Sequence, residues 1–419
     1  MYRTYNSRPL PVRSVKHRSR WPVLAVLVII VVLAAAYIAY ALLRPLPGAH
    51  LTVTPPVAPG LAKVNIPWPA SSPTEQAAFG ASEYGLLAQK NTESSTRPLP
   101  MASVAKTITA LAVLEKKPLK LGEQGPNITL TARDVAIYNE YIAKDGSVVP
   151  VSAGQTITEY QALQALMLPS ANNIADTLAT WAFGDLPSYT AYANTLVKRI
   201  GMAQTTVADA SGFSPATVGT ATDLIKLGLA AIDNPVLSQI VGQKTAEFPG
   251  YGTITNVDSL LGQSGVRGIK TGNTDEAGGV FLGAADVTIG GQQITVITAV
   301  MGAPDRPQAL RETLPLVLSA PSQFQKLQVV RSGQVVGKAT TIWGASTALQ
   351  ASQDISVVAW TGTSVAPTGT TTSAQLPASA GADVGDLSLK FNGQTQKADI
   401  ELARALSEPS VLWRLRHPF

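Results

Sequence analysis

The chain has 419 residues, of which 45% are hydrophobic and 14% are charged. This composition supports two or three domains with buried cores and excludes wholesale disorder. The net charge of +5 arises at the N-terminus, because residues 1–44 contain no acidic residue and seven basic ones: Arg3, Arg8, Arg13, Lys16, Arg18, Arg20 and Arg44. The rest of the chain is slightly acidic, which disfavours a nucleic-acid-binding body.

The chain has no cysteine, which excludes a thiol nucleophile and thiolate metal ligands. Its three histidines, His17, His50 and His417, all lie outside the segments expected to form a core. The sequence therefore disfavours both a Ser-His-Asp triad and a zinc site built on histidine.

The first predicted element is a run of 21 uncharged, mostly apolar residues at 23–43. That is about the length a helix needs to cross the hydrocarbon core of a membrane. We expect an uncleaved signal-anchor, because a cleaved signal peptide has a shorter apolar core, although the sequence AAAYIAYA keeps cleavage as an alternative. The basic residues ahead of the span predict a cytoplasmic tail at 1–22 and place the later residues outside the cytoplasm.

Residues 44–66 are rich in proline and predict an extended linker between the membrane and the next domain. The domain predicted at 67–322 begins with a strand at 83–89 and a helix at 101–116. Two helices follow within 157–183, separated at Leu168-Pro169-Ser170, and a further helix is expected at 220–232 with Thr222 as its cap.

Three strand-like runs come next, at 265–272, 278–289 and 292–303. Gly290-Gly291 predicts a hairpin between the last two, so we expect an antiparallel sheet. A helix interrupted by prolines, at 307–325, completes this domain.

Residues 323–405 carry strand patterns around a low-complexity segment at 364–382, and Asn392-Gly393 predicts another hairpin. We expect a separate β domain here, followed by a tail at 406–419. Membrane contact through Trp413, Arg414 and Arg416 is the alternative for that tail.

Ser103 and Lys106 form the only Ser-x-x-Lys pair in the chain, near the start of the helix predicted at 101–116. Residues three apart lie on one face of a helix, so the lysine amine can reach the serine hydroxyl and take its proton. Burial and a second nearby cation would favour the neutral amine by lowering its pKa. Taken alone, such a pair is more often a capping serine and a solvated lysine.

Lys270 is the candidate second cation, and Thr271 and Gly272 follow it at the end of a strand-like run. A strand of this kind lets an extended peptide pair alongside it, while the hydroxyl and the ammonium group hold a terminal carboxylate. Ser170 and Asn172 supply a proton-relay hydroxyl and an orienting amide, although most such pairs only cap helices. The three segments together predict a serine nucleophile activated by lysine.

Seven further polar or turn residues are expected to be solvated or to shape turns rather than take part in chemistry. They are Asp209, Ser211, Gly212, Asp275, Glu276, Arg306 and Arg311.

The segments PMASVAKTITAL, PSANNIADTLA, DASGFSPATVGTATDL and GIKTGNTDEAGGVFLGAA together resemble the D-alanyl-D-alanine carboxypeptidases. These are the low-molecular-mass penicillin-binding serine peptidases of the β-lactamase/transpeptidase-like superfamily. The resemblance spans about residues 67–320 and continues, more weakly, into the β-rich segment. It implies an α+β catalytic domain, with an antiparallel sheet flanked by helices and a helical subdomain, followed by a small all-β sandwich-like domain.

The resemblance also implies the reaction. Ser103 would attack the carbonyl between the two terminal D-alanines of a peptidoglycan stem peptide, and Lys106 would take its proton. Backbone N–H groups of Ser103 and Asn273 would form the oxyanion hole. Water would then release the shortened peptide, β-lactam antibiotics would acylate the same serine, and neither a metal nor an organic cofactor would be required.

The same resemblance gives Ser170 and Asn172 a part in proton relay and positioning, and gives Lys270 and Thr271 the substrate carboxylate. The second motif reads Ser-Ala-Asn rather than Ser-Asp-Asn, which weakens a β-lactamase assignment. A transpeptidase, an endopeptidase or a β-lactamase of this superfamily, and a wall-binding protein without activity, remain the alternatives.

Overall fold

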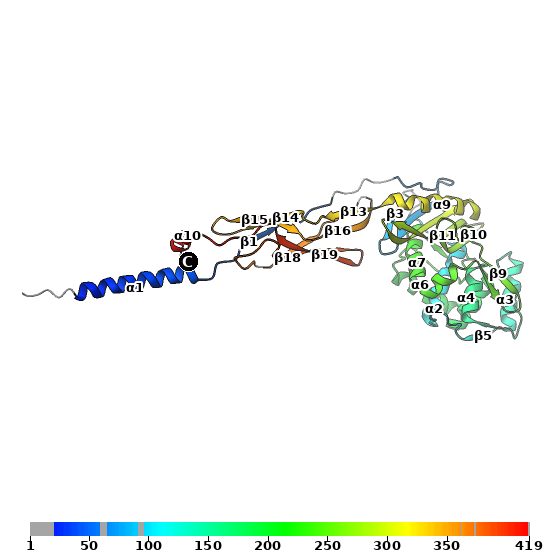
Figure 1. The fold of residues 1–419 in the computed structure, drawn as a ribbon. Coiled ribbons are helices and arrows are strands. Elements are labelled where there is room, and N and C mark those ends of the chain that lie inside the picture. The colour runs from blue at the N-terminus through cyan, green and yellow to red at the C-terminus, as the bar shows by residue number, and fades with distance from the viewer. Residues whose placement is uncertain (1–20, 59–64, 91–95, 362, 373, 418–419) are drawn as a thin grey trace, which may run out of the picture.

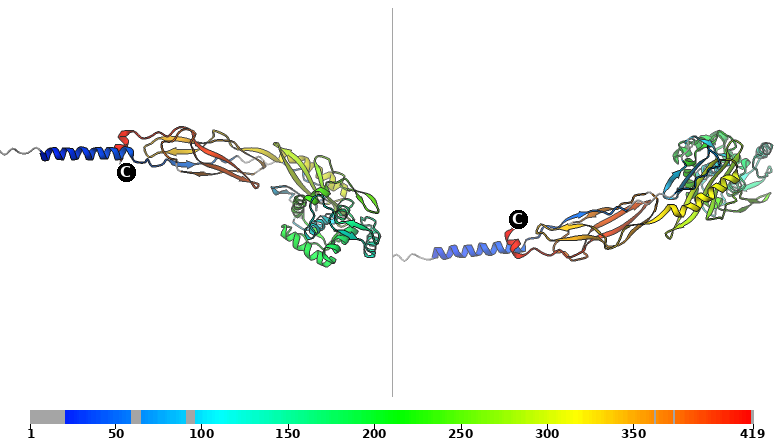
Figure 2. Two further views of the ribbon diagram at one scale, coloured as in Figure 1. Left: turned by 60° about the horizontal axis from the view of Figure 1, so that its bottom comes forward. Right: turned by 90° about the horizontal axis from the view of Figure 1, so that it is seen from above.

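The computed structural model describes residues 21–58, 65–90, 96–361, 363–372 and 374–417. Most of the predicted tail at 1–22, residues 59–64 of the predicted linker and residues 418–419 lie outside this description. Helix α1 (Trp21–Leu43), a β-rich part and an α+β part follow one another along an elongated molecule (Figure 1), and the same order is seen from two further directions (Figure 2). The β-rich part comprises β1 and β13 to β19, and the α+β part comprises β2 to α9.

Helix α1 matches the span predicted at 23–43. It has 23 residues, none of them charged, and a mean hydropathy of 2.9 over its most apolar window. Its apolar side chains are exposed, as a lipid-facing helix requires. The helix is therefore long and apolar enough to cross a membrane.

The α+β part is built on a five-stranded sheet in the order β10-β11-β12-β2-β3, in which every neighbouring pair is antiparallel. Its strands are β2 (Gln76–Ala81), β3 (Gly85–Gln89), β10 (Val266–Thr274), β11 (Gly278–Ile289) and β12 (Gln292–Ala303). Gly290 and Gly291 turn between β11 and β12 with φ of +58° and +85°, as a tight hairpin requires. The predicted antiparallel sheet is confirmed.

Helices cover both faces of this sheet. Alternate residues of a strand point to opposite faces, so Phe281 of β11 packs toward α9 (Arg306–Gln323) and Leu282 toward α7 (Ala221–Asp233). Helix α9 was expected to break at its prolines but runs unbroken through both. The burial of one helix face against the sheet outweighs their cost.

A group of helices beside α7 forms the helical subdomain, together with three short strand pairs. The helices are α2 (Lys106–Lys116), α3 (Ala132–Ala143), α4 (Glu159–Met167), α5 (Asn172–Phe183), α6 (Leu186–Arg199) and α8 (Pro235–Val241), with the 3₁₀ turn η1 (Ala102–Ala105) before α2. The strand pairs are β4 (Leu99–Pro100) with β7 (Val218–Gly219), β5 (Asn127–Thr129) with β6 (Thr156–Thr158), and β8 (Thr245–Phe248) with β9 (Gly252–Thr255).

Two details of the helix predictions can be compared directly. The break expected at residues 168–170 lies between α4 and α5, where the sequence placed it. The cap expected at Thr222 was wrong, because Thr220 Oγ1 accepts the hydrogen bond from Asp223 N and α7 begins two residues earlier.

The β-rich part has a six-stranded sheet in the order β1-β14-β15-β19-β18-β17 and a separate pair, β13 with β16. The strands are β1 (His50–Val53), β13 (Phe324–Val330), β14 (Val335–Thr340), β15 (Ser346–Ala351), β16 (Ile355–Trp360), β17 (Thr368–Thr371), β18 (Asp383–Phe391) and β19 (Gln394–Leu402). Buried residues of both sheets share one hydrophobic cluster. Asn392-Gly393 forms the predicted turn between β18 and β19, with positive φ at both residues.

Strand β1 corrects the expectation of an extended linker at 44–66. Residues 50–53 pair antiparallel with residues 337–340 of β14, so the segment after α1 is part of the β-rich sheet. The prolines that suggested a spacer lie on either side of this short edge strand, where a missing backbone N–H is tolerated. The β-rich part therefore lies between α1 and the α+β part.

Aromatic side chains join the two parts. The ring of Phe324 packs edge-on against Tyr84 and Trp360, with centroids 5.1 and 5.2 Å apart, and Phe79 lies 5.4 Å from Trp360. The Tyr84 hydroxyl donates a hydrogen bond to the carbonyl of Val358 at 2.7 Å. These contacts join the five-stranded sheet of the α+β part to the β13–β16 pair of the β-rich part, so they restrict the angle between the two parts.

Helix α10 (Val411–Arg416), in the segment expected as a tail, packs against the end of α1. The Arg414 guanidinium donates to the carbonyl oxygens of Leu42, at 2.8 Å, and Arg44, at 3.2 Å. A cation is favourable at this end of a helix, where carbonyl groups lack partners. These bonds tie α10, which follows the β-rich part in the chain, to the end of α1.

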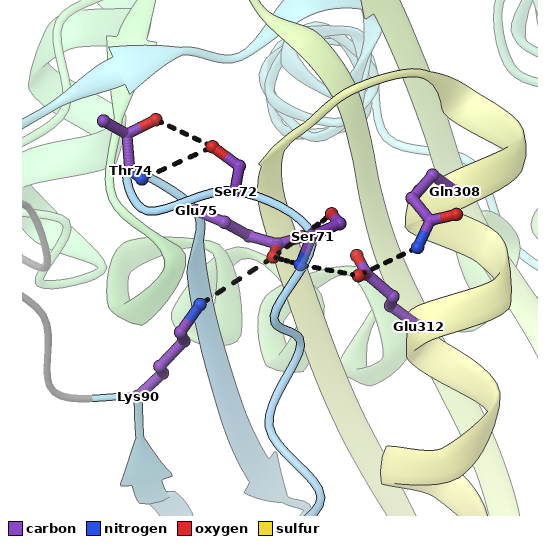
Figure 3. A network of polar contacts seen from close by, with 7 residues as sticks. All are labelled: Ser71, Ser72, Thr74, Glu75, Lys90, Gln308 and Glu312. Carbon is purple, nitrogen blue, oxygen red and sulfur yellow. Dashed lines mark hydrogen bonds and ion pairs between the residues drawn. The ribbon is translucent and has the colours of Figure 1, made fainter.

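A pair of carboxyl groups fastens the first residues of the α+β part to α9 (Figure 3). Glu75 is fully buried, and the backbone N–H of Ser71 lies 3.2 Å from both a Glu75 oxygen and a Glu312 oxygen. Lys90 Nζ lies 3.7 Å from Glu75, and Gln308 donates to Glu312 at 3.0 Å. Burial, and then the hydrogen bond to Glu312 and its charge, raise the pKa of Glu75 to about 8.

We predict that Glu75→Gln stabilises the protein at alkaline pH. A carboxyl whose folded-state pKa is raised from 4.5 to about 8 contributes stability that is complete below pH 4.5 and is lost as the pH rises through 8. The amide cannot ionise, so thermal melts at pH 8.5 should give a melting temperature about 2–4 °C above that of the wild type. The difference should vanish toward pH 5. A difference that is independent of pH, or one equalled by the exposed control Glu276→Gln, would contradict the prediction.

Candidate active site

Ser103 and Lys106 lie together where the 3₁₀ turn η1 passes into α2. Ala102, directly before the serine, has the unusual φ of +45°, and Lys106 is the first residue of α2. The Lys106 amine donates a hydrogen bond to Ser103 Oγ at 2.8 Å. The predicted contact is present, although its backbone is a tight turn followed by a helix rather than one continuous helix.

Lys106 is fully buried and makes three hydrogen bonds. Besides Ser103 Oγ, its amine reaches Asn172 Oδ1 at 2.6 Å and the carbonyl oxygen of Ser211 at 2.9 Å. Burial lowers the pKa of Lys106 to about 7, against the opposing charges of Asp209 and Asp176. The amine is thus neutral for a large fraction of the time near neutral pH, which a base acting on a serine hydroxyl needs.

The junction between α4 and α5 carries two candidate residues, Ser170 and Asn172, and only Asn172 is hydrogen-bonded to Lys106. Asn172 is the first residue of α5, and its side chain accepts from Lys106. Ser170 is buried with φ of +67°, and within the described part of the chain its Oγ has no hydrogen-bond partner. The structure therefore links Asn172 to the lysine directly and leaves the Ser170 hydroxyl available.

Lys270 and Thr271 are buried on β10, the strand at one edge of the five-stranded sheet. The Lys270 amine donates to the carbonyl of Thr271 at 3.1 Å. Burial, and next the charge of Lys106, lower the pKa of Lys270 well below its usual value, while Asp258 opposes the shift. The charge of Lys106 therefore acts on Lys270, whereas the sequence predicted that Lys270 would lower the pKa of Lys106; burial is the cause that lowers the pKa of Lys106.

Gly272 and Asn273 bring β10 close to the serine. A Cβ atom at Gly272 would lie 3.0 Å from Ala102 Cβ and 3.1 Å from the backbone nitrogen of Ser103, so only glycine permits this approach without displacement. The Asn273 side chain accepts a hydrogen bond from the backbone N–H of Arg306 at 2.9 Å. This contact fastens the end of β10 to the start of α9.

A cleft of about 310 Å³ opens beside these residues. Its lining includes Ser103, Asn172 and Asn273 and two acidic residues expected in a solvated turn, Asp275 and Glu276. Both acidic residues are exposed, so the expected turn is present and forms part of the cleft wall. Lys106 and Lys270 lie behind this surface, out of contact with solvent.

The loop around residue 211 contributes more than the sequence suggested. Asp209, Ser211 and Gly212 were expected only to shape a turn, yet the carbonyl of Ser211 binds Lys106. Gly212 has φ of +74°, and a Cβ atom there would lie 1.9 Å from the carbonyl oxygen of Ala102. The loop thus supports the turn that carries Ser103, and its Ser-Gly step was the available signal.

The fold places the chain in a known class. Penicillin binding protein 5 from Haemophilus influenzae superposes with a TM-score of 0.56 over 83% of this chain and 100% of that chain, at 18% identity. At this identity the likeness concerns the fold alone. It confirms the expected fold class, an α+β domain of the transpeptidase-like type with β sheets after it.

The sequence defines the family. Residues 85–305 match the D-alanyl-D-alanine carboxypeptidase family of peptidases, and the chain belongs to that family. A D-alanyl-D-alanine carboxypeptidase, DacB2 of Mycobacterium tuberculosis, is 34% identical over 204 residues, which are 47% of this chain and 65% of the relative. A D-alanyl-D-alanine endopeptidase of Pseudomonas aeruginosa is 31% identical over 187 residues, 43% of this chain and 57% of the relative. The chain thus spans less than two thirds of either relative.

We predict that Gly212→Ala impairs the site far more than Gly122→Ala. Both glycines have positive φ, so each substitution costs about 1 kcal/mol of backbone strain. A Cβ atom at Gly122 meets nothing within 4 Å, whereas at Gly212 it collides with Ala102, the residue before Ser103. The reaction of Ser103 with a fluorescent β-lactam should slow at least about tenfold in Gly212→Ala and stay near the wild-type rate in Gly122→Ala. Equal rates in the two variants would refute the structural role of Gly212.

Proposed function

We propose that this protein is a membrane-anchored serine-type D-alanyl-D-alanine carboxypeptidase. It removes the terminal D-alanine from peptidoglycan stem peptides through an acyl-Ser103 intermediate and is acylated by penicillins at the same residue. The observation that carries the proposal is the 2.8 Å contact from the fully buried Lys106 amine to Ser103 Oγ. A capping serine with a solvated lysine would not bury the amine.

In the first half of the proposed reaction, the neutral Lys106 amine takes the proton from Ser103 Oγ as that oxygen bonds to the carbonyl carbon between the two D-alanines. Backbone N–H groups of Ser103 and Asn273 stabilise the oxyanion. The C–N bond then breaks, and the departing amine receives the proton held by Lys106, with the free Ser170 hydroxyl as its relay. Asn172 holds the lysine in place throughout.

In the second half, water attacks the acyl-serine, its proton passes through Lys106 to Ser103 Oγ, and the shortened peptide leaves. No residue outside this set is required for the proton balance. Lys270 and Thr271 hold the substrate carboxylate. The outer edge of β10 has no neighbouring strand in the described sheet, which leaves room for an extended peptide to pair beside Gly272.

We propose the topology from the N-terminal segment. Helix α1 spans the membrane as an uncleaved anchor, the basic tail lies in the cytoplasm, and all later residues lie outside it. Residues 67–322 form the catalytic unit and residues 323–405 the β domain, to which β1 adds a strand. The β domain then separates the catalytic cleft from the bilayer, which suits an enzyme whose substrate is a cell wall.

An endopeptidase is the alternative that a specific observation favours, because one of the two relatives described above carries that name. A transpeptidase and a β-lactamase differ from the carboxypeptidase only in the acyl acceptor or donor. A wall-binding protein without activity would not need a buried amine with its pKa lowered to about 7 beside a serine. These alternatives are separated by whether Ser103 is acylated and by which products are then released.

The full-length protein in mild detergent, with Ser103→Ala as control, distinguishes these functions. Fluorescent penicillin should label the wild type alone and remain bound. A stem pentapeptide ending in D-Ala-D-Ala should lose one D-alanine. Cleavage only of cross-linked peptide dimers would favour the endopeptidase, rapid turnover of penicillin without release of D-alanine the β-lactamase, and an unlabelled, well-folded wild type the binding protein.

We also predict the pH dependence of acylation. Because Lys106 acts in its neutral form and its pKa is about 7, the rate should rise with pH and level off above about pH 8. The rate at pH 5.5 should be about 30-fold below the plateau. Stopped assays with fluorescent penicillin between pH 5 and 9 measure this curve, and a rate that is flat across this range would count against Lys106 as the base.

Lys106→Arg tests whether Lys106 is needed as a base or only as a positive charge. Arginine keeps a cation at this position but cannot lose its proton in a protein. Acylation should fall by about 10³ or more at every pH, without recovery at pH 9. Substantial acylation in this variant would show that another group removes the proton.

A further inference from the structure

Two buried side chains behind Lys106 have no assigned role in the reaction. Asp176 lies on α5 one helical turn after Asn172, which places both on the same face of the helix. Tyr141, on α3, donates a hydrogen bond from its hydroxyl to Asp176 Oδ2 at 3.0 Å. Both residues are at least nine-tenths buried, and neither lines the cleft.

These side chains connect to the lysine through Ser211. The Tyr141 hydroxyl lies 3.3 Å from Ser211 Oγ, and Ser211 Oγ donates to Asp209 Oδ2 at 2.8 Å. The carbonyl of the same serine accepts the hydrogen bond from Lys106. The hydroxyl of Ser211 is therefore held by Asp209 and lies in contact with the Tyr141 hydroxyl, while its carbonyl accepts from the amine.

A buried carboxyl group is costly unless something compensates for its desolvation. Burial raises the pKa of Asp176 to about 6, so the group is still largely ionised at neutral pH. An asparagine could make the same bond to Tyr141 without that cost. What the aspartate adds is negative charge in a dry region close to a lysine whose proton affinity is already depressed by burial.

We propose that Asp176 is a positioning residue for Lys106, acting through Tyr141 and Ser211, and that its charge preserves the lysine's affinity for the proton. The proposal rests on the function proposed above, in which Lys106 first takes a proton from Ser103 and then returns it to the departing amine. A base that binds the proton too weakly would deprotonate the serine poorly. The charge of Asp176 thus limits how far burial reduces the proton affinity of Lys106.

Other charged groups lie around Lys106. Asp209, in the loop beside α2, acts with Asp176 and favours the protonated amine, while the charge of Lys106 itself lowers the pKa of Lys270 on β10. Glu140 on α3 acts on Asp176 itself. Tyr141 and Tyr189 also interact with Asp176 and Asp209, and burial raises the pKa of each phenol, so both stay neutral between pH 5 and 9.

Asp176→Asn tests the proposal in the full-length protein in mild detergent, by the rate of acylation with fluorescent penicillin as a function of pH. The substitution keeps the shape and the bond to Tyr141 but removes the charge, so Lys106 should lose its proton at lower pH. Relative to its own plateau, the variant should react about 1.5-fold faster than the wild type between about pH 6 and 7. The two curves should meet at pH 5, where Asp176 of the wild type is itself protonated.

Tyr141→Phe is the second variant. It keeps both carboxyl groups but breaks the link from Asp176 to Ser211, so the plateau rate should fall several-fold while the curve moves less than in Asp176→Asn. Asp233→Asn is the matched control, because it removes one exposed charge outside the cleft and should leave the curve unchanged.

The outcomes separate this proposal from the function on which it rests. If Ser103 of the wild type is not acylated, the proposed function fails. If the wild type is acylated but Asp176→Asn gives the wild-type curve, with or without a lower melting temperature, Asp176 is only structural and the positioning proposal fails. Should Asp176→Asn not fold, an unchanged plateau rate in Tyr141→Phe overturns the proposal equally.

Discussion

The burial of one lysine amine is the constraint on which the rest of this site depends. Lys106 is removed from solvent, and the cost of keeping it charged there lowers its pKa to about 7. Three acceptors from three separate segments satisfy the amine, so each segment has to be placed to within a few tenths of an ångström. A serine beside such an amine has a base within hydrogen-bond distance, without any histidine.

The fold places these segments precisely because two glycines let neighbouring backbone segments come close to the turn that carries Ser103. Gly272 lets β10 reach the nitrogen of Ser103, and Gly212 lets the neighbouring loop lie against Ala102. The sheet beneath is held by helices on both faces. Beyond it, the aromatic contacts around Phe324 and the bonds from Arg414 to the end of α1 connect the site to α1 through the β-rich part. The position of the site relative to α1 is thus built into the same chain.

Much of this arrangement could be predicted from sequence, and the failures have physical reasons. The sequence identified Ser103, Lys106 and Lys270 because their residue types and order are unusual together. It identified the hairpin at Gly290-Gly291 because such a turn depends only on the two glycines themselves. Strand β1 was not predictable, because its partner lies almost 290 residues away and proline dominated the local signal. The contact from Ser211 was missed for a similar reason, since a backbone carbonyl bound by a distant lysine leaves no mark on residue type.

The central claim, that Lys106 is a base because it is buried, is tested most directly by measuring its pKa. NMR titration of the protein with ¹³C-labelled lysine side chains, with the Lys106 signal assigned through Lys106→Arg, gives that value without reference to any substrate. The account predicts a midpoint near 7 for Lys106. A midpoint near 10.5, the ordinary value for lysine, would contradict it, because the amine would then be protonated throughout the range in which the enzyme is proposed to act.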